Sequence, residues 1–324
     1  MSLLRCRHLW IVAVLALTAA AASVASAENY PARPVRVIVP FAPGGSTDII
    51  ARIVAQELSR QLGQPFVIEN VAGASGNIGT GRAARAAPDG YTVLFAYSSY
   101  VTNPFIFEKV PYDPSKDLVP VTLMVTSPAV LAVHPSLPVG KVKDLVVLIR
   151  ANPGKLNYAS GGTGTQPHLA AEQFRLSLGL DIVHVPFNGG GPALTSLVAG
   201  HTPIGFTTLS PTMPYIKAAK LRALAVTSKA RAVPDLPTMK AAGYPGIDGD
   251  TWVGVLVPAG TDDQIIAILN REIVKVLNLP TVNERLLGLG YETVGNRPGE
   301  YAAQLRAELV KWSKVVHLAG IKPQ

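Results

Sequence analysis

From residue 35 onward, the sequence alternates short apolar runs with glycine-rich turns and amphipathic segments. Residues 35–39 are predicted to form a strand, residues 40–46 a turn rich in proline and glycine, and residues 47–62 a helix with one apolar face. Two more strands are predicted at 66–69 and 91–96, with a short helix between them. Such an alternation is typical of parallel strands covered by helices, so it predicts an α/β fold.

A second set of alternating elements begins near residue 127. Its predicted strands are 130–134, 156–159, 182–185 and 221–227, and its predicted helices are 142–151, 167–178 and 189–199. A later strand at 252–257 is expected to return to the first sheet, before helices that start near residues 262, 281 and 298. Because 324 residues suffice for two domains, we expect domain 1 to comprise residues 28–126 and 250–324, and domain 2 residues 127–249.

The first 27 residues have the three parts of a secretory signal peptide. Arg5 and Arg7 precede an uncharged apolar run from Leu9 to Ala22, and Ala-Ser-Ala at 25–27 forms a small-residue cleavage site. We therefore expect cleavage after residue 27 and export, most simply to a bacterial periplasm. The alternative, an uncleaved membrane anchor, is disfavoured because the apolar run is shorter than the ~20 residues that a span needs.

The sequence lacks the signatures of common catalytic, metal and nucleotide sites. Its single cysteine, Cys6, lies in the leader, which disfavours disulfides, a thiol nucleophile and a cysteine zinc site in the exported chain. Gly-Ala-Ser-Gly-Asn at 73–77 misses the G-x-S-x-G pattern of serine hydrolases, and no P-loop or G-x-G-x-x-G occurs. The basic residues behind the net charge of +8 are dispersed. We expect no catalysis, no cofactor, no metal and no nucleic-acid partner.

Glycine-rich turns recur at four places where a predicted strand gives way to a helix, at residues 43–48, 73–77, 160–165 and 188–191. Each exposes backbone N–H groups and small hydroxyls at the positive end of a helix, which can bind an anion without lysine or arginine. One such turn is an ordinary connection. Four of them in two α/β units favour an anion cleft at the carboxyl ends of the strands.

Individual residues near these turns have two interpretations each. Asp48 could contact a ligand, or it could stabilise the helix dipole. His168 could contact a ligand, or it could make a polar contact within the protein. Phe187 and Trp252 could form walls of the cleft, or they could pack in the core.

The sequence closely resembles the extracytoplasmic solute receptors of tripartite tricarboxylate transporters, the Bug receptors. The matching stretches cover nearly all of residues 30–323 and include PFAPGGSTDIIAR (40–52), ENVAGASGNIG (69–79), NPGKLNYASGGTGTQPHLAAE (152–172), VHVPFNGGGPAL (183–194) and TWVGVLVPAGT (251–261). The resemblance implies a two-domain periplasmic binding protein of type II, with a flytrap-like cleft between two sheets. It also implies a carboxylate held by backbone amides, hydroxyls and ordered water.

Carried over by position, the resemblance predicts three ligand-binding loops. The predicted binding residues are Gly44, Gly45, Ser46, Thr47 and Asp48 in the first loop, Ser160, Gly162, Thr163, Gly164, Thr165 and His168 in the second, Phe187 and Asn188 in the third, and Ser98, Thr207 and Trp252 beside them. The family commonly has acidic residues after Ala-Gly-Gln-Val, where this chain has Pro203 and Thr207. Without a carboxylate to pair an ammonium group, amino-acid ligands are disfavoured.

We therefore expect a receptor that captures a dicarboxylate, a tricarboxylate or an aromatic carboxylate and presents it, as a monomer, to the membrane subunits of a tripartite transporter. Two alternatives stay open at this point. One is a ligand-loaded periplasmic sensor that acts on a membrane signalling kinase. The other is an exported hydrolase.

Overall fold

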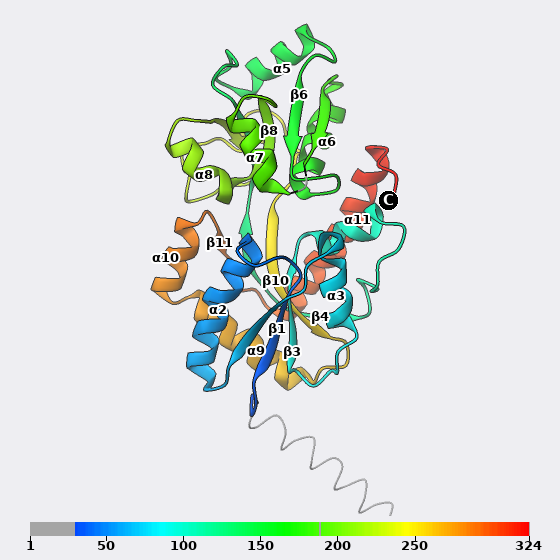
Figure 1. Cartoon of the computed structure of the whole chain (residues 1–324), viewed down its shortest axis with the longest axis vertical. Helices are drawn as coiled ribbons and strands as arrows, with labels where there is room; N and C mark the ends of the chain where they lie inside the picture. The colour runs from blue at the N-terminus through cyan, green and yellow to red at the C-terminus, as the bar shows by residue number, and fades with distance from the viewer. Residues whose placement is uncertain (1–29, 188, 324) are drawn as a thin grey trace, which may run out of the picture.

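The computed structural model describes residues 30–187 and 189–323, which form two β-sheets with helices on both faces (Figure 1). The predicted signal peptide lies outside the described residues. The elements around the first sheet are β1 (Val35–Val39), α2 (Ser46–Leu62), β2 (Phe66–Asn70), the 3-10 turn Ala74–Gly76, α3 (Asn77–Ala84), β3 (Thr92–Tyr97), α4 (Ser99–Ile106), β4 (Leu118–Ser127), β10 (Thr251–Pro258), α9 (Asp263–Leu277), α10 (Pro280–Gly288), β11 (Glu292–Thr293) and α11 (Pro298–Leu318). Those around the second sheet are β5 (Ala129–Val133), α5 (Val142–Ala151), β6 (Asn157–Ser160), α6 (Gln166–Leu178), β7 (Val183–Pro186), α7 (Gly190–Val198), β8 (Ile204–Thr208), α8 (Leu209–Lys217) and β9 (Arg222–Val226).

Both sheets are mixed, which corrects the prediction of parallel sheets. In the first sheet, of order β11-β4-β10-β3-β1-β2, only the β1–β2 and β1–β3 pairs are parallel, and β10 runs antiparallel to β3 and β4. In the second, of order β7-β6-β8-β5-β9, β6 is parallel to β7 and β8, while β5 is antiparallel to β8 and β9. The strand–helix alternation correctly indicated the parallel pairs, and the antiparallel strands arise where the chain changes sheet.

The chain passes between the sheets twice, once between β4 and β5 and once between β9 and β10. The strand β10 returns to the first sheet, as expected, and inserts between β3 and β4. The strands of the first sheet thus come from residues 35–127 and 251–293, and those of the second from residues 129–226. The domain boundaries drawn from the sequence stay a prediction.

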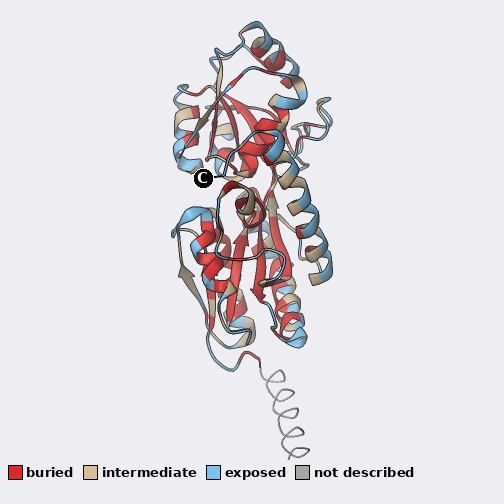
Figure 2. Ribbon diagram, turned by 90° about the vertical axis from the view of Figure 1, so that its right-hand side faces the viewer, coloured by how far each residue is buried: buried red, intermediate tan, exposed pale blue. Residues whose placement is uncertain are grey.

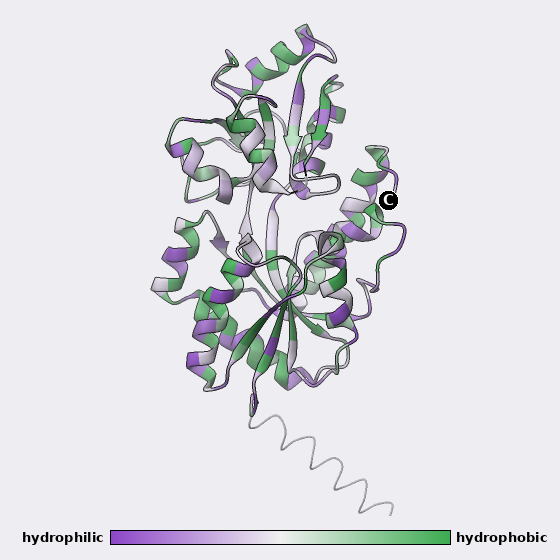
Figure 3. Cartoon of the chain, in the orientation of Figure 1, coloured by the Kyte–Doolittle hydropathy of each residue, from purple (hydrophilic) through white to green (hydrophobic). Residues whose placement is uncertain are grey.

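Four apolar clusters, one on each face of each sheet, hold this arrangement together. On the first sheet, α2, α9 and α10 pack against one face, and α3, α4 and α11 pack against the other. On the second sheet, α5 and α6 cover one face, and α7 and α8 cover the other. Buried residues therefore concentrate in the strands and the inward helix faces (Figure 2), where the side chains are also the most hydrophobic (Figure 3). Within the described ranges, no helix is long and apolar enough to cross a membrane.

Several elements were not predicted, and prolines account for three of them. Pro104 lies inside α4, Pro120 inside β4, and both Pro211 and Pro214 inside α8, so these stretches read as loops. The short strands β8 and β11 also went unpredicted, since β8 has only five residues, three of which are glycine or threonine. Both β8 and α8 contribute residues to the cleft between the sheets.

The strand β10 is buried along its whole length, and its alternation fixes how both faces of the first sheet are packed. Val253, Val255 and Val257 point into the cluster with α2 and α9. Trp252 and Leu256 point the other way, toward α11. Gly254 lies between them on that same face, where a methyl group would overlap the hydroxyl oxygen of Tyr301.

Replacing Gly254 by alanine should therefore destabilise the fold. We expect Gly254→Ala to lower the free energy of unfolding by about 1–3 kcal/mol, the usual cost of overpacking a core. Gly288→Ala is the matched control, because nothing lies within 4 Å of a methyl group there and alanine favours a helix. Urea unfolding of both variants checks this. Equal stability of Gly254→Ala and the unmodified protein would contradict it.

Candidate functional site

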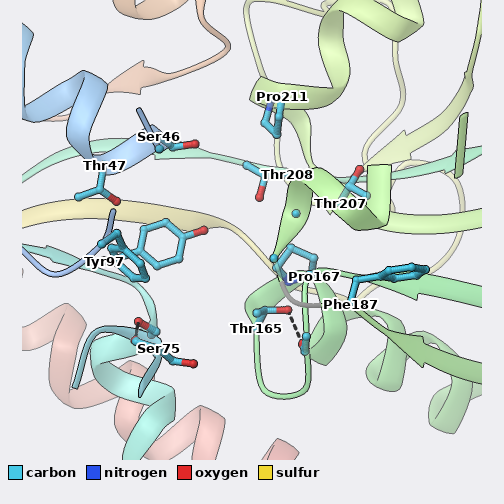
Figure 4. Close-up of a pocket in the computed structure, with 18 of the residues that line it drawn as sticks. Ser46, Thr47, Ser75, Tyr97, Thr165, Pro167, Phe187, Thr207, Thr208 and Pro211 are labelled. Carbon is cyan, nitrogen blue, oxygen red and sulfur yellow. Dashed lines mark hydrogen bonds between the residues drawn. The ribbon is translucent and has the colours of Figure 1, made fainter. Parts of the chain in front are cut away.

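A cleft of about 1050 Å³ lies between the two sheets, at the carboxyl ends of their strands. Loops that follow β1 and β3 form one side of it, and loops that follow β6, β7 and β8 form the other (Figure 4). The lining residues from the described chain are glycine, proline, alanine, hydroxyl-bearing residues and large apolar residues, and none of them is charged. Within this lining, the groups that can attract an anion are therefore backbone N–H groups and hydroxyls.

The helices that begin at the cleft lack side-chain caps. The residues before α2, α4, α6, α7 and α8 make no capping hydrogen bond through their side chains. Among the other helices, Asp262 caps α9, and Asp144 and Glu300 accept the N–H groups of the residues before α5 and α11, whereas α3 and α10 also lack a side-chain cap. The uncapped N–H groups and the helix dipoles therefore give the cleft a preference for anions.

In the first loop, Gly44, Gly45, Ser46 and Thr47 line the cleft as predicted for ligand-binding residues, although their binding role stays a prediction. The Thr47 side chain is 3% exposed, and its hydroxyl makes no hydrogen bond within the described residues. It points toward the interior of the cleft near Tyr97 (Figure 4). Because this hydroxyl faces the cleft and has no partner among the described residues, Thr47 is suited to donate to a bound anion.

Asp48 is absent from the cleft lining and instead organises the first loop from behind. Its carboxylate accepts hydrogen bonds from the Gly44 N–H (2.9 Å), the Arg52 guanidinium (2.9 Å) and the Asn70 amide (2.9 Å). Burial alone would raise the pKa of Asp48, but these hydrogen bonds outweigh it and hold the pKa below its ordinary value. The side chain is fully engaged by these partners, which favours a structural role over ligand contact.

In the second loop, Gly162, Thr163 and Thr165 line the cleft, whereas Ser160, Gly164 and His168 do not. The Thr165 hydroxyl donates to the Gly162 carbonyl at 2.8 Å (Figure 4). Gly164 faces Ile106, and a methyl group there would clash with the Ile106 side chain. The imidazole of His168 lies beneath the loop, where its Nδ1 accepts the Gly164 N–H at 3.0 Å.

The remaining predicted residues are divided between the cleft and the core. Phe187 and Thr207 line the cleft, and Asn188 lies outside the described residues. Ser98 is fully buried and exchanges two hydrogen bonds with Gln166 of α6. Trp252 is 2% exposed and donates its indole N–H to Glu308 at 2.7 Å, because the β10 alternation turns it toward α11. Pro203, one of the two positions where the family commonly has an acidic residue, is also absent from the lining.

The sequence reasoning missed an apolar and hydroxyl-rich part of the lining. It comprises Phe41, Tyr97, Ser99, Ile106, Phe107, Thr208, Pro211 and Thr212, whereas Ser75 belongs to the glycine-rich turn 73–77 that the sequence analysis placed at the cleft. Tyr97 follows directly from the predicted strand 91–96, so its position at a carboxyl end was a usable signal. Thr208 and Pro211 belong to β8 and α8, which were not predicted. Burial, with Tyr291 nearby, raises the pKa of Tyr97 to about 12, so its hydroxyl stays protonated and can donate.

Comparison with known proteins identifies the family. The family described as "Tripartite tricarboxylate transporter family receptor" matches residues 50–321. The chain belongs to this receptor family. It is 38% identical over 320 residues to protein BugT of Bordetella pertussis (strain Tohama I), which covers 98% of each chain.

Solved structures of relatives share the two-domain fold of periplasmic binding proteins. A structure described as a periplasmic transporter is 43% identical, with a TM-score of 0.81 over 90% of this chain and 99% of the other. An R. palustris protein solved with adipate is 36% identical, with a TM-score of 0.82 over 91% of this chain and 100% of the other. MatC from Rhodopseudomonas palustris, with bound malate, is 33% identical, with a TM-score of 0.77 over 89% of this chain and 100% of the other. The predicted family and fold class are therefore confirmed.

Two histidines behind the second loop, His168 buried and His184 half-buried, make stability depend on pH. Burial, and the nearby His184, lower the pKa of His168 to about 3, and burial lowers the pKa of His184 to about 4. The unfolded chain takes up these protons near the ordinary value of 6.5, while the folded protein stays neutral. The free energy of unfolding should therefore fall as the pH drops from about 6.5 to about 4, by at most ~1.4 kcal/mol per pH unit for each histidine.

Denaturant unfolding at pH 7, 6 and 5 measures this slope. A double variant, His168→Asn with His184→Gln, keeps the carboxylates unchanged and should lose less stability over the same range. If the double variant and the unmodified protein lose stability in parallel, the histidines do not contribute to the slope.

Proposed function

We propose that this receptor binds a small organic carboxylate in the cleft and delivers it to the membrane subunits of a tripartite transporter, without catalysing a reaction on it. The observation that carries the proposal is the set of uncapped helix starts that meet in a cleft whose described lining has no charged side chain. An anion placed there satisfies N–H groups from both sheets at once. Residues 1–27 would direct export to the periplasm and be removed.

The energetics of such a site are adequate without a buried arginine. Micromolar affinity corresponds to about −8 kcal/mol. Hydrogen bonds to a charged group contribute about 1.5–3 kcal/mol each, so a few from the first and second loops suffice. Since those loops belong to different sheets, a carboxylate that bridges them favours the closed cleft.

The neutral lining also limits the chemistry of the ligand. An amino acid would bring an ammonium group into a cleft whose described lining has no carboxylate to pair with it, and an unpaired buried charge is costly. The family relatives solved with adipate and with malate support a ligand that carries only negative charge. Among the alternatives, nothing in the family match supports a kinase-linked sensor, since its description names a transporter receptor.

A ligand panel tests the proposal. We expect adipate or malate to raise the melting temperature, since a ligand at 100 times its Kd stabilises by about 2.7 kcal/mol, and glutamate at the same concentration to leave it unchanged. Calorimetry gives the affinities, and native mass spectrometry identifies what co-purifies. A co-purified ligand without a carboxylate, together with no shift by any acid, would contradict the proposal. Turnover of a bound ester would show that the hydrolase alternative is right.

The Thr47 hydroxyl provides a specific test of the first loop. Thr47→Val keeps the shape of the side chain and removes one donor, which should weaken binding of the acid by about five- to ten-fold. Thr281→Val, at an exposed position of α10 outside the lining, is the matched control and should bind as the unmodified protein does. Unchanged affinity in Thr47→Val would exclude this hydroxyl from the site.

A further inference from the structure

Two histidines are stacked directly beneath the second loop, outside the cleft lining. The imidazole rings of His168 and His184 lie 4.0 Å apart between centroids, at 23° to one another. Tyr158 continues the stack, with its ring centroid 4.9 Å from that of His184. Nothing in the proposed binding chemistry uses these rings, since neither histidine lines the cleft.

Each ring is connected to the backbone of the loop. His168 Nδ1 accepts the N–H of Gly164 at 3.0 Å. His184 Nε2 lies 2.7 Å from the Ser160 hydroxyl oxygen, which in turn accepts the N–H of Gly162 at 3.2 Å. The pair therefore holds two of the loop's glycine N–H groups, one directly and one through Ser160. Thr163, between these glycines, lines the cleft.

The first loop has a related arrangement with a different acceptor. Gly44 has a φ of +81° and donates its N–H to Asp48, four residues later, and Gly164 has a φ of +80° and donates to His168, also four residues later. The charge of Asp48 is balanced by Arg52. The acceptor under the second loop is neutral.

The charged groups near the histidine pair are already matched to one another. Glu172 forms an ion pair with Arg175 at 2.7 Å and accepts the Tyr158 hydroxyl at 2.7 Å. Burial would raise the pKa of Glu172, but the hydrogen bonds from Arg175 and Tyr158 outweigh it and keep the carboxylate ionised. Glu172 therefore needs no charged histidine as a partner. The lowered pKa values of His168 and His184 keep both rings neutral at pH 7.

We propose that His168 and His184 are positioning residues for the anion site: as a neutral stacked pair, they fix the glycine N–H groups of the second loop so that the loop is already arranged for a ligand. This inference rests on the proposed carboxylate site. A neutral ring suits the task because Nδ1 can accept a hydrogen bond only when it carries no proton. A carboxylate in its place would accept equally well but would add negative charge behind a loop that binds an anion.

The test uses variants that keep or remove a single acceptor. His168→Asn places its amide oxygen near the position of Nδ1 and retains the acceptor, whereas His168→Leu removes it. His184→Gln and His184→Leu form the same comparison for Nε2. His317→Leu, at an exposed position of α11, is the control for a histidine-to-leucine change.

The first measurement needs no ligand. Amide hydrogen exchange in the free protein should become about ten-fold faster at Gly164 in His168→Leu and at Gly162 in His184→Leu, while amides of β1 stay unchanged. His168→Asn and His184→Gln should stay within about three-fold of the unmodified protein. Unchanged exchange in the leucine variants, or equal acceleration in the asparagine and glutamine variants, would overturn the proposal.

The second measurement is calorimetry with adipate and with malate. We expect binding to weaken about ten-fold in each leucine variant and to be restored in His168→Asn and His184→Gln, while His317→Leu binds normally. Full affinity in a leucine variant whose loop exchanges faster would overturn the link between loop order and binding. If neither acid binds the unmodified protein, the proposed ligand class fails, while hydrogen exchange still decides the positioning role.

Discussion

The cleft depends on one repeated hydrogen bond, from a glycine N–H at the start of a loop to the side chain four residues later. Gly44 donates to Asp48, and Gly164 donates to His168. Both glycines have φ near +80°, a backbone conformation that side-chain-bearing residues rarely adopt. Each bond removes one N–H from the loop and fixes the turn, so that the next N–H groups, at the helix start, remain directed at the cleft. The acceptor must therefore come from behind the loop.

The acceptor behind each loop is kept from adding net negative charge in a different way. Asp48 is ionised, with Arg52 and Asn70 bonded to it, while His168 is kept neutral by burial and by the second imidazole stacked on it. In both cases the group behind the loop adds little net negative charge. The positive ends of the helices thus remain available to an anion, although the lining of the described cleft carries no cation.

Local patterns in the sequence predicted most elements of the fold and the two main loops of the cleft. The predicted ranges 35–39 and 142–151 coincide with β1 and α5, because their apolar periodicity and flanking turns are strong. The antiparallel strands could not be predicted from alternation, and the prolines of α8 concealed a helix. Ser98 and Trp252 could not be placed because their partners, Gln166 and Glu308, are 68 and 56 residues away in the chain. The sequence also could not predict that His168 lies behind the second loop and not in the cleft, because tertiary contacts decide this.

A contact between the two sheets indicates which of the cleft loops moves when the cleft closes. Gln166, the first residue of α6, exchanges two buried hydrogen bonds with Ser98 at the end of β3, and Leu169 of the same helix is buried in the cluster that contains Trp252. The start of α6 is therefore anchored to the first sheet directly beside Thr165. The loop after β7, which carries Phe187, has no such anchor among the contacts described, whereas Ser210, just after β8, packs against Gly290 of the first-sheet region. We therefore expect closure to move the loop after β7 more than the second loop, whose geometry must already be correct in the open protein. A rigid support of the kind that the histidine pair provides is what such a fixed loop requires.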